Sequence, residues 1–160
     1  MEPTRLDELF LREAIRLARR SVLEHGGGPF GALVVRGEEV LGRGWNQVTT
    51  ANDPTAHAEI VAIREAAQHV GDFRLQGCVL YSSCEPCPMC LAAAYWARIE
   101  AVWYAADRRS AAAAGFDDAR LYGELALPAP RRRLPCRQHL AVEGELPFRE
   151  WLAKPDRVPY

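Results

Sequence analysis

The stretch CEPCPMC, residues 84–90, decides how this 160-residue chain is interpreted, because it places three of the five cysteines within seven residues. The first twenty residues, MEPTRLDELFLREAIRLARR, mix charges among the apolar side chains and lack the apolar core of an export signal. Without such a signal, crowded cysteines are more often metal ligands or catalytic groups than disulfide partners. The sequence therefore predicts a cytoplasmic protein whose cysteines bind a metal.

The composition is that of an ordinary globular domain. Hydrophobic residues make up 49% of the chain, charged residues make up 26%, and the net charge is −1. A chain of this length buries roughly two-thirds of the surface that its unfolded form exposes. No apolar run approaches the ~20 residues of a membrane span, and a net charge near zero provides no field that attracts nucleic acid. We expect one domain over residues 1–160, with neither a membrane nor a nucleic acid as its partner.

The apolar pattern predicts alternating strands and helices. Residues 6–18 repeat apolar side chains with helical spacing, and two β-rich runs flank a short turn at residues 36–38, as in a hairpin. The other expected elements are a helix after residue 53, a strand at 78–83, a helix from residue 86, a strand at 100–106, a weak strand at 139–144 and a closing helix around 148–152. This order favours an α/β sandwich with a five-stranded mixed sheet.

The cysteines have a possible partner thirty residues earlier. Cys87 and Cys90 are three residues apart at the expected start of a helix, where both sulfur atoms point to one side and unpaired N–H groups favour thiolates. DPTAHAEI, residues 53–60, adds His57 as a third ligand and Glu59 as a carboxylate beside it. The order His-x-Glu followed by Pro-Cys-x-x-Cys is the signature of zinc deaminases. We predict one Zn²⁺ on His57, Cys87 and Cys90, with the fourth position left to water.

A structural zinc site with Cys84 as the fourth ligand is the alternative. Cys84 ends the expected strand and need not share a face with the other two cysteines of the motif. A closed site of this kind would make the protein a zinc-stabilised binding module. An open coordination position distinguishes the enzyme from the module.

A three-ligand site suits hydrolysis. Zinc lowers the pKa of a bound water from ~15.7 towards ~7, which makes hydroxide available to attack a carbon that carries an exocyclic amine. A carboxylate must then carry protons to the ring nitrogen and to the departing ammonia. Glu59 is the predicted acid–base group, a role typically worth ~10²–10⁴ in rate.

Nearly the whole chain also resembles a known family, the small bacterial guanine deaminases of the cytidine-deaminase-like superfamily. The likeness is carried by GGPFGA (27–32), NQVTTANDPTAHAE (46–59), SCEPCPMCLAAAYWAR (83–98), AAAAGFDD (111–118) and the terminal PFREW…PY. The resemblance implies a three-layer α/β/α sandwich and the hydrolysis of guanine to xanthine and ammonia.

The resemblance also implies residues that contact the purine. Ala58 would offer its backbone N–H, and the side-chain amide of Asn46 would read the base with a donor and an acceptor. Phe30 and Trp96 would stack on its two faces.

Two further implied contacts lie nearer the end of the chain. Asp118, or alternatively Asp117, would accept hydrogen bonds from the guanine N–H groups. Tyr160 would close the active site as a lid, and the segment 145–160 would be exchanged across a homodimer, so that each lid covers the partner's pocket.

Other substrates share most of these motifs. Guanosine, cytosine, cytidine and an ammeline-like triazine are alternative small substrates. The tRNA adenosine deaminases resemble the chain in DPTAHAEI and EPCPMC, but the chain differs from them in AAAAGFDDARLYGEL, residues 111–125. RNA binding would also need a basic face, and the best candidate for one, residues 131–133 with Arg137, lies in a proline-rich loop.

Overall fold

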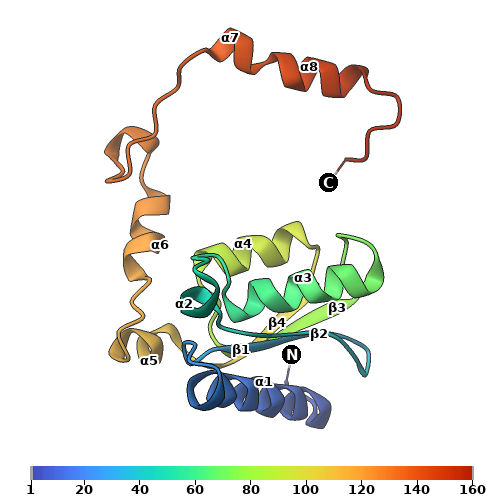
Figure 1. Ribbon diagram of the computed structural model, residues 1–160, viewed down its shortest axis with the longest axis vertical. Helices are drawn as coiled ribbons and strands as arrows, with labels where there is room; N and C mark the ends of the chain where they lie inside the picture. The colour runs from blue at the N-terminus through green and yellow to red at the C-terminus, as the bar shows by residue number, and fades with distance from the viewer. Residues whose placement is uncertain (1, 160) are drawn as a thin grey trace. The chain divides into compact units, whose positions relative to one another are not determined.

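The computed structural model describes residues 2–159, and the chain divides into two compact units, Met1–Asp118 (unit 1) and Ala119–Tyr160 (unit 2). Unit 1 contains the predicted alternation of strands and helices (Figure 1). Its elements are α1 (Arg5–Glu24), β1 (Gly31–Arg36), β2 (Glu39–Trp45), α2 (Val48–Ala51), α3 (Ala58–Val70), β3 (Cys78–Cys84), α4 (Pro88–Trp96), β4 (Ala101–Ala106) and α5 (Arg108–Ala113).

The strands form a mixed sheet in the order β2-β1-β3-β4. β1 runs antiparallel to both β2 and β3, whereas β3 and β4 are parallel. The described residues contribute four strands to this sheet, so the prediction of five strands is wrong. Residues 139–144, expected as a weak last strand, instead contain the helical turn α7 (Ala141–Gly144). Leu140 adopts a left-handed conformation with φ of 56°, and its carbonyl accepts the N–H of Gly144, which closes a helical turn where a strand would need extended backbone.

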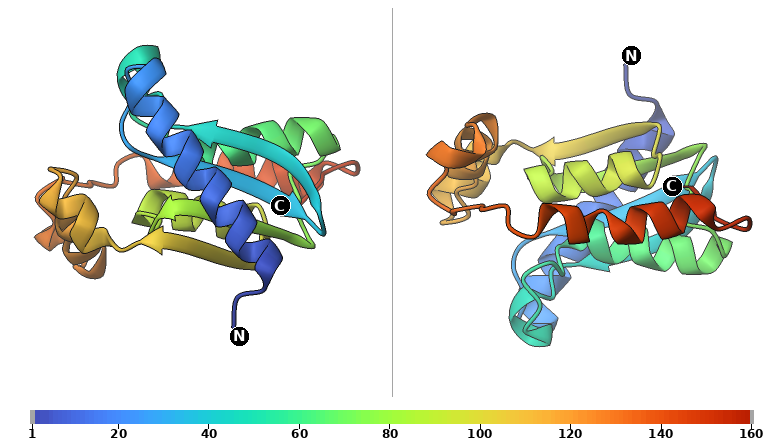
Figure 2. Two further views of the ribbon diagram at one scale, coloured as in Figure 1. Left: turned by 90° about the horizontal axis from the view of Figure 1, so that it is seen from below. Right: turned by 90° about the horizontal axis from the view of Figure 1, so that it is seen from above.

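Helices cover both faces of the sheet in unit 1, which confirms the three-layer α/β/α prediction. α1 crosses one face and α3 and α4 lie on the other, as the views from either side show (Figure 2). On the α1 face, Leu17 packs with Leu33 and Tyr81. On the α3–α4 face the core is built mainly from small side chains with Leu75 and Leu80.

Two glycines in β2 allow α3 to lie unusually close to the sheet. A Cβ atom at Gly44 would be 2.0 Å from the carbonyl oxygen of Ala58, and one at Gly42 would be 2.2 Å from that of Ala62. Real Cβ atoms do not approach so closely, so any larger residue would push the helix away. The glycines therefore set the distance between the first turn of α3 and the sheet.

Unit 2 consists of helical segments. They are α6 (Ala119–Ala126), η1 (Ala129–Arg131), α7 (Ala141–Gly144) and α8 (Leu146–Ala153). α8 confirms the predicted closing helix, and none of the four segments has a buried residue. Tyr160, the proposed lid, lies outside the described residues. In the described part of the chain, no helix has the length and apolar character needed to cross a membrane.

Candidate active site

The three predicted metal ligands converge at the beginnings of two helices. His57 is the residue that precedes α3, and Cys87 is the one that precedes α4, with Cys90 in the first turn of α4. Pro88 occupies the first position of α4, where its missing N–H costs nothing and its fixed φ favours the helix. Because α3 and α4 lie on the same face of the sheet, their first turns bring the three side chains together.

The distances between the ligand atoms fit a zinc ion. His57 Nδ1 lies 3.6 Å from Cys87 Sγ and 3.5 Å from Cys90 Sγ, and the two sulfur atoms are 3.6 Å apart. Tetrahedral zinc, with bonds of about 2.3 Å to sulfur and 2.0–2.1 Å to nitrogen, separates its ligand atoms by about 3.5–3.8 Å. The residues therefore fit the predicted cofactor without rearrangement.

The two cysteines of the cluster differ in their electrostatics. Cys87 Sγ and Cys90 Sγ form a hydrogen bond at 3.6 Å, and this bond, together with His57, lowers the pKa of Cys87 to about 4. The same bond and burial raise the pKa of Cys90. A bound cation removes the proton that the two sulfurs share, since coordinating thiols are deprotonated.

Cys84 does not join the cluster. Among the described residues, the His, Cys, Asp and Glu side chains that come together closely enough for a metal are His57, Cys87 and Cys90. The Cys84 thiol instead donates to the carbonyl oxygen of Asp107 at 3.7 Å, and burial raises its pKa to about 11. A neutral thiol turned towards a carbonyl does not support the closed, structural site.

Glu59 is a buried carboxyl group beside the ligands. It is 4% exposed; its Oε1 accepts a hydrogen bond from Ser82 Oγ at 3.0 Å, and its Oε2 accepts one from Cys90 Sγ at 3.5 Å. Burial raises the pKa of Glu59, while the Ser82 hydrogen bond opposes the shift. A carboxyl whose proton is retained more readily than in water suits a group that both takes up and delivers protons.

The amide of Asn46 is held more tightly than the sequence indicates. Asn46 is 7% exposed, and its Oδ1 accepts the N–H groups of Gly28 and Val48, both at 3.3 Å. The backbone N–H of Asn46 donates to the carbonyl of Phe30. Because two backbone donors occupy the amide oxygen, the NH₂ group is the part of the side chain left for a ligand.

Comparisons with known proteins agree with this geometry. Residues 4–106 match the family described as the cytidine and deoxycytidylate deaminase zinc-binding region. The guanine deaminase of Bacillus subtilis (strain 168) is 51% identical over 90% of this chain and 92% of its own length. The chain belongs to the guanine deaminase branch of this zinc-binding family. An X-ray structure of Bacillus subtilis guanine deaminase superimposes with a TM-score of 0.92 at 48% identity, covering 96% of this chain and 98% of that one. The tRNA-specific adenosine deaminase of Aquifex aeolicus is 43% identical over 62% of this chain and 65% of its own length.

Membership of this family confirms the relationship expected from the sequence. The α/β fold and the zinc-binding character of the domain are likewise confirmed. The roles of individual residues stay predictions. The residues differ in how near they lie to the candidate metal ligands.

Phe30 and Asp118 lie close to the candidate site. Phe30 packs on the core beside α3 and α4, and the ring of Phe116 meets it edge-on with the centroids 5.0 Å apart. Burial raises the pKa of Asp118, and the negative charge of Cys87 raises it further, so this carboxyl group lies within electrostatic range of the ligands. Ala58 is buried in the first turn of α3.

Trp96 lies farther from the metal ligands. It ends α4, six residues and about 9 Å of helix rise beyond Cys90, and it is 64% exposed. Its stacking on the purine stays a prediction.

Sequence reasoning missed two residues of the site, Ser82 and Phe116. Ser82 lies two positions after Leu80 in β3, and both side chains point to the α3–α4 face, since side chains alternate along a strand. That alternation was readable in the sequence. The Phe116 contact was not, because residues 30 and 116 belong to distant segments.

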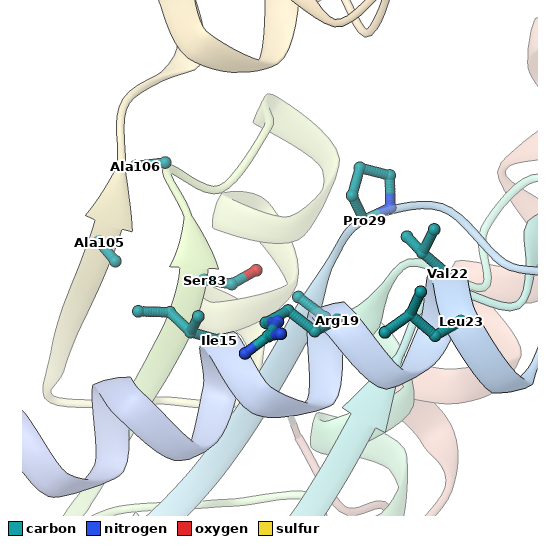
Figure 3. A pocket seen from close by; sticks show the side chains of 9 residues that line it. Ile15, Arg19, Val22, Leu23, Pro29, Ser83, Ala105 and Ala106 are labelled. Atoms are coloured by element: carbon teal, nitrogen blue, oxygen red, sulfur yellow. The ribbon is translucent and has the colours of Figure 1, made fainter.

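A separate cavity of about 590 Å³ lies beside α1. Ile15, Val22 and Leu23 of α1 line it together with Ser83 and the end of β4 (Figure 3). Ser83 alternates with Ser82 and points to the α1 face, so this cavity is on the opposite side of the sheet from the ligand cluster. It is therefore not part of the candidate active site.

The metal site makes a direct prediction. Replacing Cys87 with Ala leaves two ligands, and we expect the zinc content to fall from about one ion per chain to below about a fifth of that, because two ligands bind far more weakly than three. Atomic absorption on the purified variant measures this. The control is Cys136→Ala, since Cys136 is exposed and outside the cluster. Full zinc occupancy in Cys87→Ala would contradict the ligand assignment.

Proposed function

We propose that this protein catalyses the hydrolytic deamination of guanine to xanthine and ammonia. The observation that carries the proposal is the three-ligand cluster with the buried Glu59 carboxylate against it. The substrate is supported by the likeness to guanine deaminase of Bacillus subtilis, which extends over 90% of the chain, whereas the likeness to the tRNA-specific enzyme of Aquifex aeolicus covers 62%.

The ligand set we propose for zinc is His57, Cys87 and Cys90, which would hold one ion per chain. When bound, zinc supplies a Lewis acid that makes water nucleophilic near neutral pH. Glu59 accepts a proton from the water that attacks C2 of guanine and delivers it to N3. It then passes a second proton, from the new hydroxyl group at C2, to the amine. The C2–N bond breaks as ammonia leaves.

The proton carrier must be held in one orientation. Glu59 has three rotatable side-chain bonds, and the hydrogen bond from Ser82 fixes one of its carboxylate oxygens. The other oxygen contacts Cys90, one of the residues that would hold the zinc ion. Ser82 thus acts as a positioning residue for Glu59.

Several groups are arranged to hold the purine. The N–H groups in the first turn of a helix have no partner within the helix, so Ala58 can donate one to the base. The Asn46 NH₂ group donates to an acceptor on the base, and Asp118 accepts from its N–H groups. Phe30, braced by Phe116, provides one stacking face. We assign the second face to Trp96 and the lid to Tyr160.

We also propose that the protein is a homodimer that exchanges residues 145–160. The support is the apolar surface of unit 2, where Phe148 is 70% exposed and Leu152 is 65% exposed. Helices with such side chains and no buried residue gain stability by packing on another surface. A cytoplasmic location is proposed as well, because thiolate ligands require a reducing compartment.

The activity itself is tested with a substrate panel. We expect ammonia release by the zinc-loaded protein from guanine, and none from guanosine, cytosine, cytidine, ammeline or a tRNA stem-loop with adenosine. Glu59→Gln should keep zinc but lower kcat by at least ~10²-fold, since it removes the proton carrier. Ammonia release from another compound of the panel would identify a different substrate. A near-normal rate in Glu59→Gln would exclude Glu59 as the proton carrier.

The Ser82 hydrogen bond is tested with two neighbouring serines. Ser82→Ala should lower kcat about 10-fold or more with KM little changed, because a hydrogen bond to a charged group is worth about 1.5–3 kcal/mol. Ser82→Thr keeps the hydroxyl and should restore much of the rate. Ser83→Ala is the matched control: Ser83 accepts the N–H of Gly31 on the other face, so its loss should affect stability and not kcat. Equal kcat values in Ser82→Ala and Ser83→Ala would contradict the assignment.

The dimer is tested by its mass in solution. Light scattering should give twice the 17.8 kDa of the chain. Deleting residues 145–160 should return the mass to that of one truncated chain, because the exchanged helix α8 is removed. A full-length protein with the mass of one chain would rule out the exchange.

A further inference from the structure

Glu85, within the metal-binding motif, has no role in the mechanism above, yet it contacts the segment that follows β4. Its backbone N–H donates to the carbonyl of Ala106 at 2.8 Å, which continues the pairing of β3 with β4 beyond Cys84. Its side-chain Oε2 accepts the backbone N–H of Arg108, the first residue of α5, at 3.1 Å. The motif loop is therefore joined to the end of β4 by one hydrogen bond and to the start of α5 by another.

The segment 107–118 makes contacts at both of its ends. α5 has no buried residue, so little apolar packing holds it against the sheet. At its start, Asp107 accepts the N–H of Ser110, and Glu85 accepts that of Arg108. After the turn at Gly115, whose φ of 93° favours glycine, Phe116 rests edge-on against Phe30.

This segment carries two groups of the proposed purine site. Phe116 braces the stacking ring of Phe30, and Asp118 is the proposed acceptor for the N–H groups of guanine. We expect a shift at the start of α5 to move both groups, because they follow its last residue, Ala113, by three and five positions. Catalytic groups such as Glu59 belong to other elements and do not depend on α5.

We propose that Glu85 is a positioning residue for substrate binding: its carboxylate anchors the start of α5 and so keeps Phe116 and Asp118 in place at the purine site. This inference rests on the proposed function. It assigns to the motif a task separate from metal binding, since the loop that supplies Cys87 also holds the purine-contacting segment.

The backbone hydrogen bond is the part of the contact that matters. The charged groups of Glu85 and Arg108 are 3.9 Å apart, and their side chains are 24% and 49% exposed, so water screens the ion pair and it contributes little. A carboxylate that accepts a backbone N–H makes the stronger, charge-assisted bond. Glu85→Gln keeps an acceptor oxygen at this position and should therefore retain most of the function.

The kinetic test compares Glu85→Ala, Glu85→Gln and Glu100→Ala with guanine as substrate. Glu100 is the matched control, because its Oε1 accepts the backbone N–H of Gly77 at 3.0 Å, at the opposite end of the parallel strands β3 and β4. We expect KM to rise about 5–10-fold in Glu85→Ala, the equivalent of one hydrogen bond, with kcat within about twofold and zinc content unchanged. Glu85→Gln and Glu100→Ala should stay within about twofold of the wild type in KM.

A second measurement does not depend on activity. Hydrogen exchange followed by mass spectrometry should show faster exchange in residues 107–118 of Glu85→Ala, and wild-type exchange there in Glu100→Ala. Unchanged exchange in Glu85→Ala, an equal rise of KM in Glu100→Ala, or loss of zinc from Glu85→Ala would overturn the proposal. If the wild-type protein does not deaminate guanine, the proposed function fails by itself, and the exchange measurement still decides whether Glu85 anchors the segment.

Discussion

The close approach of α3 to the sheet is the constraint on which the site depends. Gly42 and Gly44 leave no side chain between β2 and the carbonyls of α3, so the helix lies directly on the strand. Its first turn then faces that of α4, and the ligand atoms of His57, Cys87 and Cys90 come within 3.6 Å of one another. A wider gap between helix and sheet would move the imidazole of His57 away from the two cysteine sulfurs. The carboxylate of Glu59, in the same turn of α3, would move away with it.

Around that cluster, the side chains of neighbouring residues of β3 point to opposite faces of the sheet. Ser82 points towards α3 and bonds Glu59, whereas Ser83 points towards α1 and bonds the backbone of Gly31. The loop that follows bonds the start of α5 through Glu85. The end of β3 thus links Glu59, the hairpin and the segment 107–118, because strand alternation and the loop together direct consecutive side chains to separate elements.

Much of the fold and of the metal cluster could be predicted from local patterns. Helical spacing located α1 and α3, and the short turn at residues 36–38 located the hairpin. The prediction is wrong at residues 139–144, where a short apolar run indicates a strand although Leu140 is left-handed and a helical turn follows. Such a run is ambiguous, because a strand needs a partner and local sequence does not reveal whether one exists.

The sequence by itself determined the family, and it predicted His57, Cys87 and Cys90 as zinc ligands with Glu59 beside them, because these depend on residue types at fixed spacings along one helix turn or one loop. Only the tertiary structure decided that Cys84 turns to Asp107, that the oxygen of Asn46 is occupied by two backbone donors, and that Ser82 and Glu85 support other groups. Each of these facts is a contact between segments distant along the chain. Their partners are set by how helices and strands pack, which local residue patterns do not encode.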